Sequence, residues 1–245
     1  MTKILFIGNS FSEDATRYIE KISCGELFVR NMYIGGCSLE THAKNAGSGE
    51  ACYDYQKDAE PISRISIQDA LTCEAWDCVS VQQVSSLSGI GDSYEPYITT
   101  LIGEIRRLAS QAQIVFHRTW SYDEGSGHPE FYRYNNDSNF MWECIQKATA
   151  EIAKRHSLRI IPTGNAIAAA RLEPELAHVG GKVSLTRDSF HLSLDYGRYL
   201  AGLVLYKFFT GKSPLEVEFA PEKCDTGVIK KIKSIVDALD FNALT

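Results

Sequence analysis

The stretch that most constrains the fold is residues 3–13, Lys-Ile-Leu-Phe-Ile-Gly-Asn-Ser-Phe-Ser-Glu. A short apolar run that ends at a glycine is typical of a buried strand in a parallel sheet. Ser10, with Glu13 three residues later, is typical of a helix start. The stretch therefore predicts a strand that turns directly into a helix, with Ser10 at the carboxyl end of the strand. Ligands bind at that edge of open α/β sheets, where a helix N-terminus offers unpaired backbone N–H groups.

The same Ser-x-x-Glu pattern also has a purely structural explanation. A capping box places serine and glutamate three residues apart at a helix start, and it stabilises the helix by about 1 kcal/mol without any chemistry. Whether Ser10 only caps the helix or acts as a nucleophile depends on which partner residues the remainder of the chain supplies.

The size and charge of the chain exclude several classes of protein. With 245 residues and 44% hydrophobic residues, the chain can bury one sizeable core, and we expect residues 1–245 to form one domain. The net charge is -6 and the pI is about 5.6, without a run of Lys or Arg that could neutralise a phosphate backbone. The sequence therefore predicts no nucleic-acid partner.

The N-terminus and the cysteines bear on the compartment and on cofactors. Strand-like residues begin at Lys3, which leaves no room for a signal peptide, and no apolar run reaches membrane-spanning length. We expect a soluble cytoplasmic protein without a membrane partner, or a secreted or periplasmic one if a leader has been removed. Seven scattered cysteines form no Cys-x-x-Cys pair, and no His, Cys and Asp cluster has metal-ligand spacing. The sequence predicts neither a metal nor a cofactor.

Strand-like and helix-like segments alternate along the chain. Residues 43–61 are polar and aperiodic, so we expect them to cross the surface as a flap near the site. Strands that alternate with helices indicate parallel βαβ units. The predicted fold is an α/β three-layer α/β/α sandwich around a mainly parallel, flavodoxin-like sheet of about five strands. Beyond the first strand we predict strands at 27–34, 77–83, 113–118 and 158–161, and helices at 14–24, 65–71, 94–110, 137–156 and 194–210.

Asp188 and His191 are the candidate partners of Ser10. A serine hydroxyl becomes a good nucleophile when a base removes its proton, and a carboxylate fixes the tautomer of that base. Asp188-x-x-His191 supplies both groups within one turn and leaves one imidazole nitrogen to face a serine. A turn capped by Asp188 and a surface histidine would explain the same residues.

The other histidines are weaker candidates for the base. His42 and His117 are placed so that either could line the site, but neither has a carboxylate at a comparably short spacing. His128, His156 and His178 lie in polar or loop-like sequence, and we expect them to be solvated.

Acyl transfer also needs hydrogen-bond donors for the oxyanion. Three candidates fall at carboxyl ends of predicted strands: the backbone N–H of Ser10, the backbone N–H of Gly36 and the side-chain amide of Gln83. Gln82 is the alternative to Gln83. Because neighbouring side chains in a strand point to opposite faces, we expect only one of the two to reach the site. A plain glycine turn and a hydrogen-bonded polar pair are the structural alternatives.

At these residues the chain resembles the SGNH (GDSL-like) hydrolase superfamily, whose members carry a serine, a glycine, an asparagine and a histidine in four separated blocks. Residues 8–12, Gly-Asn-Ser-Phe-Ser, look like the first block, with Asn9 at the usual aspartate position, and residues 188–191 look like the last. Residues 35–40 and 81–85 are similar to the middle blocks of the sialic-acid acetylesterase-like branch. The third block departs from the superfamily pattern, because it lacks the asparagine, and Gln83 is our substitute donor.

The resemblance covers residues 4 to about 211 and implies a serine esterase. Ser10 would attack the ester carbonyl, His191 would act as base and then as acid, and Asp188 would orient His191. The resemblance also implies a short acyl group, acetyl above all, on a carbohydrate hydroxyl, so the partner would be a small-molecule or oligosaccharide ester. Side chains that would suit substrate contacts are Trp120, Tyr122, Phe131, Tyr132, His42 and Gln82, although aromatic residues in loops also serve packing.

Three other functions stay open. A carbohydrate-binding protein of this fold with weak or no turnover would fit the altered third block. A lipase or thioesterase would need a long apolar trough, which sequence does not reveal. A flavodoxin-like nucleotide or flavin binder would use the helix start at Ser10 for phosphate, but it lacks a glycine-rich phosphate loop.

Overall fold

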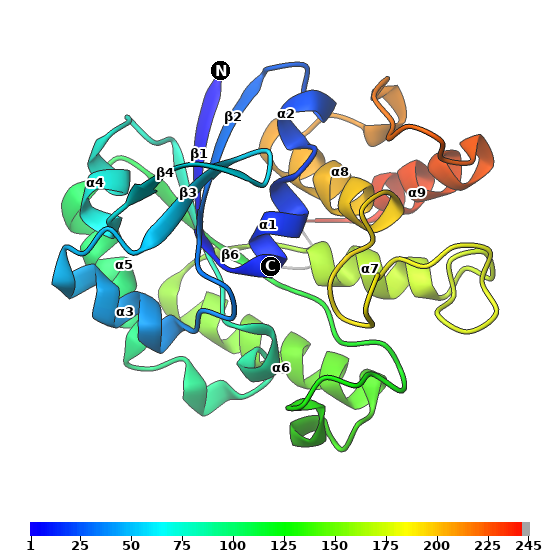
Figure 1. Ribbon diagram of the computed structural model, residues 1–245, viewed down its shortest axis with the longest axis horizontal. Coiled ribbons are helices and arrows are strands. Elements are labelled where there is room, and N and C mark those ends of the chain that lie inside the picture. The colour runs from blue at the N-terminus through cyan, green and yellow to red at the C-terminus, as the bar shows by residue number, and fades with distance from the viewer. Residues whose placement is uncertain (242–245) are drawn as a thin grey trace.

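A computed structural model describes residues 1–241 and contains a central seven-stranded sheet in the order β4-β3-β2-β1-β5-β6-β7 (Figure 1). Five neighbouring strands of this sheet, from β2 through β1, β5 and β6 to β7, run parallel to one another. When the parallel strands are counted alone, their order is 2-1-3-4-5, the flavodoxin-like order. The prediction of a mainly parallel sheet of this type is confirmed. The parallel strands are β1 (Thr2–Gly8), β2 (Leu27–Tyr33), β5 (Cys78–Val81), β6 (Gln113–His117) and β7 (Arg159–Ile161).

An antiparallel hairpin extends the sheet beyond β2. Its strands are β3 (Tyr53–Lys57) and β4 (Glu60–Ile65), and β3 pairs with β2. The expectation that residues 43–61 form a surface flap is wrong, because helix α3 (Leu39–Ser48) and this hairpin occupy most of them. Tyr53 and Tyr55 of β3 are buried, whereas β4 is mostly exposed. The alternation of apolar and polar residues that would predict a strand is therefore missing from half of the hairpin.

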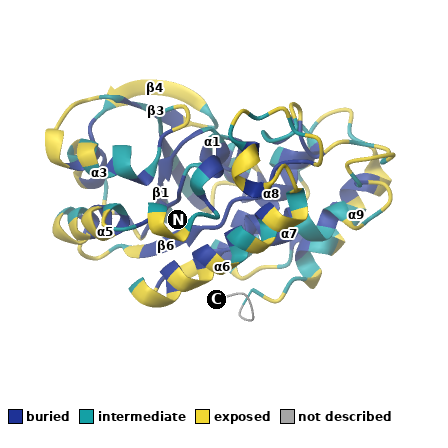
Figure 2. Cartoon of the chain, turned by 90° about the horizontal axis from the view of Figure 1, so that it is seen from below, coloured by how far each residue is buried: buried dark blue, intermediate teal, exposed yellow. Residues whose placement is uncertain are grey.

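Helices cover both faces of the sheet, and the two cores lie between sheet and helices (Figure 2). Alternate residues of β1 enter opposite cores, since Ile4 and Phe6 join one and Leu5 and Ile7 the other. The three-layer prediction is therefore confirmed. The first core is covered by α1 (Ser10–Thr16), α2 (Ile19–Ile22), α7 (Thr163–Arg171), α8 (Tyr196–Thr210) and α9 (Thr226–Ala238). The second is covered by α3, α4 (Ile67–Thr72), α5 (Tyr97–Leu108) and the C-terminal half of α6 (Ser138–His156).

Short 3-10 helices shape the loops between these elements. They are η1 (Ser85–Leu87), η2 (Gly91–Ser93), η3 (Phe131–Tyr134) and η4 (Pro214–Glu216). Two of them, η1 and η3, follow the carboxyl ends of β5 and β6. Within residues 1–241, no helix has both the length and the apolar character needed to cross a membrane.

The turn from β1 into α1 uses Asn9, and not Ser10, as the helix cap. The Asn9 Oδ1 atom accepts a hydrogen bond from the backbone N–H of Phe11 at 3.0 Å. Gly8 allows the close approach of the helix, because a Cβ atom at this position would lie 2.4 Å from Ser12 Oγ. The Ser10 hydroxyl is therefore not needed to cap the helix.

Candidate active site

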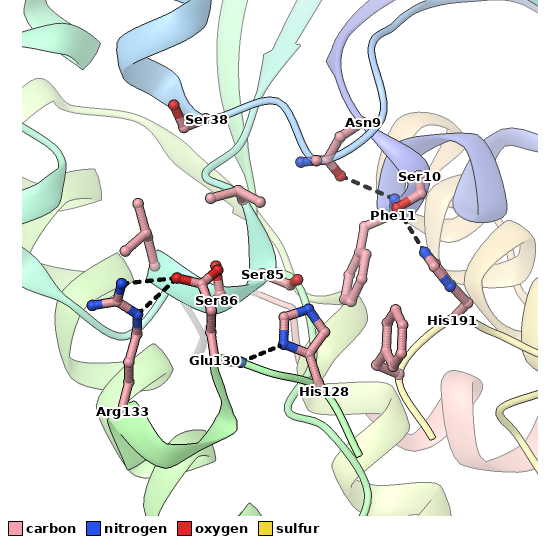
Figure 3. A pocket seen from close by; sticks show the side chains of 14 residues that line it. Asn9, Ser10, Phe11, Ser38, Ser85, Ser86, His128, Glu130, Arg133 and His191 are labelled. Carbon is pink, nitrogen blue, oxygen red and sulfur yellow. Dashed lines mark hydrogen bonds and ion pairs between the residues drawn. The ribbon is translucent and has the colours of Figure 1, made fainter. Parts of the chain in front are cut away.

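The structure brings Ser10 and His191 together from opposite ends of the chain (Figure 3). Ser10 is the first residue of α1, and His191 lies in the turn that precedes α8. Ser10 Oγ lies 2.8 Å from His191 Nε2, and His191 Nδ1 lies 2.7 Å from Asp188 Oδ2. The three predicted residues thus form one hydrogen-bonded chain.

Asp188 determines which imidazole nitrogen carries the proton. Burial raises the pKa of the Asp188 carboxyl, but hydrogen bonds from the His191 ring and from the backbone N–H groups of His191 and Phe190 outweigh burial, so the pKa lies below its ordinary value. An ionised carboxylate only accepts hydrogen bonds, so His191 Nδ1 must donate to it. His191 Nε2 is then the acceptor of the Ser10 hydroxyl proton, as general-base catalysis requires.

The turn that carries this pair contains a residue in an uncommon conformation. Ser189, between Asp188 and His191, has a φ of 75° in the left-handed region. This conformation accompanies a tight turn in which Asp188 Oδ1 accepts the backbone N–H of His191 at 2.8 Å. Such a strained position in a non-glycine residue is common at functional sites.

A cavity of about 390 Å³ adjoins the Ser10 hydroxyl. Its walls come from α1, the loop before α3, the segment after β5, the loop around η3 and the turn before α8. Serine, histidine and charged side chains line much of it, together with a few apolar ones. The lining residues are Asn9, Ser10, Phe11, Gly36, Ser38, Val84, Ser85, Ser86, Leu87, His128, Glu130, Arg133, Phe190 and His191.

Two of the predicted oxyanion donors lie at this cavity. The N–H of Ser10 belongs to the first residue of α1, where backbone donors have no partner within the helix. Gly36 has a φ of 62°, and a Cβ atom built there would meet nothing within 4 Å. Asn9 Nδ2 donates to the carbonyl of Cys37 at 3.0 Å, which ties the Gly36 turn to the start of α1.

Gln83, the third predicted donor, does not line the cavity, and this prediction is wrong. Its Oε1 atom accepts the backbone N–H groups of Leu39 and Val84, each at 2.9 Å. Its Nε2 atom donates to the carbonyl and hydroxyl oxygens of Ser93 at 3.0 and 3.1 Å. The amide is thus fully used in holding three loop segments together.

Gln82 also lies behind the cavity wall and not in it. Its Nε2 atom donates to Asn9 Oδ1 at 2.8 Å, and its Oε1 atom lies 3.0 Å from His117 Nδ1. Gln82 therefore supports the residue that caps α1. The proposed substrate contact at Gln82 is wrong, because its polar atoms already have buried partners.

Most of the predicted substrate-contacting residues are buried packing residues. Trp120, Tyr122 and Phe131 are fully buried, and His42 is buried beside Tyr53, with Nδ1 2.9 Å from the tyrosine hydroxyl. None of them lines the cavity, so the predicted substrate contacts of Trp120, Tyr122 and His42 are wrong. Among the four predicted aromatic residues only Tyr132 is exposed, with 62% of its surface accessible.

The far side of the cavity is lined by polar residues that were not predicted from the sequence. Arg133 donates from Nε and Nη2 to Glu130 Oε1 at 3.0 and 2.8 Å, and both residues line the cavity with Ser85 and Ser86 (Figure 3). The position of the two serines, directly after a strand predicted to end at the ligand-binding edge, is a signal that could have identified them.

Of the three histidines expected to be solvated, His178 is exposed, as predicted, whereas His128 and His156 are half-buried, and all three have polar partners. His128 lines the cavity, and its Nε2 atom lies 3.3 Å from the Tyr122 hydroxyl. His156 contacts Glu95 at 2.7 Å, and His178 contacts Asp123 at 3.0 Å. Within residues 1–241, no group of three or more His, Cys, Asp or Glu side chains is arranged to hold a metal ion.

The hydrogen bonds around His128 fix the direction in which the Ser85 hydroxyl can donate. The backbone N–H of Glu130 donates to His128 Nδ1, so a neutral ring carries its proton on Nε2 and donates it to the Tyr122 hydroxyl. Burial lowers the pKa of His128, which favours the neutral ring. Tyr122 then donates to Ser85 Oγ, 2.9 Å away, and the proton of Ser85 remains available to the cavity.

Comparison with known proteins gives a family and a fold. A family model described as a domain of unknown function, DUF4886, matches residues 3–236. The crystal structure of a DUF4886 family protein from Bacteroides uniformis is 34% identical, covers 96% of this chain and 93% of its own, and superposes with a TM-score of 0.88. No curated protein matches the sequence.

More distant solved structures share the fold of SGNH hydrolases. A candidate SGNH hydrolase from Slackia heliotrinireducens is 23% identical, with a TM-score of 0.59 over 85% of this chain and 98% of its own. A catalytic mutant of an acetylxylan esterase from Geobacillus stearothermophilus is 14% identical, with a TM-score of 0.53 over 91% of this chain and 97% of its own. The mostly parallel sheet flanked by helices is thus the SGNH hydrolase fold.

Proposed function

The chain belongs to the DUF4886 family, a domain family of unknown function, and from its own site we propose that it is a serine esterase of the SGNH type. The observation that carries this proposal is the chain of contacts from Ser10 Oγ to His191 Nε2, 2.8 Å, and from His191 Nδ1 to Asp188 Oδ2, 2.7 Å, at the edge of a cavity. A hydroxyl, a base and an orienting carboxylate in this arrangement can perform acyl transfer.

The reaction would proceed in two steps. Ser10 Oγ attacks the carbonyl carbon of the ester while His191 Nε2 takes the hydroxyl proton. His191 then passes this proton to the leaving alcohol oxygen as the C–O bond of the ester breaks, which leaves Ser10 acylated. In the second step, His191 Nε2 takes a proton from water as the water oxygen attacks the acyl carbon. The bond between Ser10 Oγ and the acyl carbon then breaks, His191 returns the proton to Ser10 Oγ, and the carboxylic acid is released.

The negative charge on the carbonyl oxygen needs donors in the cavity. We assign this role to the backbone N–H groups of Ser10 and Gly36, as predicted, and to the hydroxyl of Ser85 in place of Gln83. Support for Ser85 is its position in the cavity lining and the hydrogen-bond sequence from His128 through Tyr122, which leaves its proton free.

The lining supports an ester with a short acyl group and a hydroxylated alcohol part, such as an acetylated sugar. Glu130 and Arg133 place a carboxylate acceptor and guanidinium donors in the cavity wall, which an extended apolar chain could not use. Tyr132, on the same 3-10 helix, is exposed, and its ring centroid lies 5.6 Å from the Arg133 guanidinium carbon. An exposed ring beside charged hydrogen-bonding groups suits the apolar face and the hydroxyls of a sugar.

Labelling with a fluorophosphonate probe tests the proposal. We expect covalent modification at Ser10, its loss in Ser10→Ala and a strong reduction in His191→Ala, together with hydrolysis of p-nitrophenyl acetate that follows the same order. Circular dichroism and thermal melts of each variant check that folding is intact. A folded, unmodified protein that neither labels nor hydrolyses would refute the esterase and favour a carbohydrate-binding protein.

A further inference from the structure

Asp14 is a fully buried carboxylate on the helix that carries Ser10. It stands four residues after Ser10 in α1, which places both side chains on neighbouring positions of one helix face. A buried charge is costly to a fold unless it is paired and hydrogen-bonded. Its partners therefore indicate what this carboxylate does.

Within residues 1–241, the hydrogen-bond partners of the Asp14 carboxylate belong to the turn of His191 or to the helix that follows it. Arg187 Nη1 donates to both carboxylate oxygens, at 2.9 and 3.1 Å, and the backbone N–H of Leu192 donates to Oδ2 at 2.8 Å. Arg198 of α8 donates from Nε to Oδ1 at 2.8 Å. Arg187 and Leu192 stand on either side of the segment from Asp188 to His191.

The turn between these two anchors is closed on itself. The backbone N–H of Arg187 donates to the carbonyl of His191 at 2.9 Å, and Thr186 and Leu192 form an antiparallel bridge. Arg187 Nη1 also donates to the carbonyl of Leu192. The turn with Asp188 and His191 is thus a compact unit, and both of its ends are attached to one carboxylate on α1.

We infer that Asp14 is a positioning residue that holds the His191 turn against α1 and so maintains the contact between His191 Nε2 and Ser10 Oγ. This inference rests on the proposed function, since it assigns Asp14 a part in the same acyl transfer. A displacement of about 1 Å between reacting groups can lower a rate by about 100-fold. The carboxylate does not contact the substrate cavity, so it acts only through His191.

Glu20 provides a matched control for the loss of the Asp14 carboxylate, because it is also a largely buried carboxylate with an arginine partner. Its Oε1 atom accepts the backbone N–H of Val29 and Arg30 Nη1, both at 2.9 Å, so it makes the same kinds of interaction as Asp14. Glu20 lies on α2 and does not line the cavity. Glu20→Gln is therefore expected to lower stability without a change in catalysis.

The experiment compares Asp14→Asn with Glu20→Gln. For each we would measure kcat and KM with p-nitrophenyl acetate, the rate of fluorophosphonate labelling at Ser10, and the melting temperature, with kinetics recorded well below the melting range. We expect Asp14→Asn to lower kcat about 10- to 100-fold, with KM within about twofold and the labelling rate reduced in parallel. Glu20→Gln should retain kcat and labelling.

The outcomes separate this inference from the proposed function. Unchanged kcat and labelling in Asp14→Asn, with an active unmodified protein, would overturn the positioning role alone. An unmodified protein that neither labels nor hydrolyses would overturn the esterase and this role with it. Should Asp14→Asn fail to fold, Arg187→Gln removes one anchor and leaves Arg198 on Asp14, and a kcat equal to that of the unmodified protein would contradict the role.

Discussion

The indole of Trp120 stacks on the ring of Phe11, with ring centroids 4.3 Å apart and planes inclined by 16°. Phe11 follows Ser10, the proposed nucleophile, and Trp120 Nε1 also donates to the carbonyl of Phe190, next to His191, at 2.8 Å. One buried side chain therefore contacts both segments of the candidate active site. This packing explains why Trp120 is unavailable to a sugar.

We predict that Trp120→Ala destabilises the protein by about 3–5 kcal/mol, the usual cost of truncating a buried aromatic residue. Trp120→Phe should cost less and retain folding, because a ring remains on Phe11. Urea denaturation measures both changes. If Trp120 bound substrate instead, Trp120→Phe would raise KM for a sugar ester without a comparable loss of stability.

Removal of the Ser85 hydroxyl is expected to slow the chemical step. Ser85→Ala should lower kcat about 100-fold and leave KM nearly unchanged, because an oxyanion donor acts in the transition state. Tyr122→Phe retains the Ser85 hydroxyl but removes the group that orients it, so a smaller decrease is expected. Steady-state kinetics with p-nitrophenyl acetate would measure both. Equal activity of Ser85→Ala and the unmodified protein would exclude Ser85 as a donor.

Substitution of Arg133, in the cavity wall, and of Tyr132, exposed beside it, should separate sugar esters from simple esters. Arg133→Ala and Tyr132→Ala are each expected to raise KM about 10-fold for an acetylated oligosaccharide, equivalent to about 1.4 kcal/mol, but to leave p-nitrophenyl acetate hydrolysis unchanged. Phe140→Ala is the control, because this exposed aromatic residue belongs to α6 and not to the 3-10 helix that carries Tyr132 and Arg133. A parallel change on both substrates would argue against a sugar-binding role.

The stability of the protein should decrease in mild acid because of two buried histidines. Burial lowers the pKa of His42 and of His117 to about 3. The unfolded chain, with histidine pKa values of about 6.5, therefore binds more protons than the folded chain between pH 6.5 and 3. The free energy of unfolding should fall as the pH falls through this window, by up to about 1.4 kcal/mol per pH unit for each histidine.

Urea denaturation of the unmodified protein, His42→Gln and His117→Gln at pH 7, 6 and 5 measures this effect. Each glutamine should flatten the dependence of the free energy of unfolding on pH, whatever it does to the absolute stability. A slope that stays the same in both variants would show that other groups cause the acid sensitivity.

Local pattern was sufficient for the parallel strands of the sheet and for the candidate reactive groups, but not for the hairpin of β3 and β4. The apolar run from Lys3 to Gly8 predicted a buried strand, and the spacing of Asp188 and His191 placed both within one turn, where they are hydrogen-bonded. The oxyanion donor was misassigned because Gln82 and Gln83 follow the end of β5 at Val81, so strand alternation no longer decides where their side chains point.

By itself the sequence determined the parallel α/β layers and the candidate nucleophile, base and carboxylate. The spacing of apolar residues, the glycine that ends the first strand and the short distance in sequence between Asp188 and His191 are all local properties of the chain. Only the tertiary structure decided that Asn9 caps the helix, that Trp120, Tyr122 and His42 are buried, and that Asp14 joins the Ser10 helix to the His191 turn. Those features depend on which segments, distant along the chain, pack together, and burial and hydrogen-bond partners exist only after that packing.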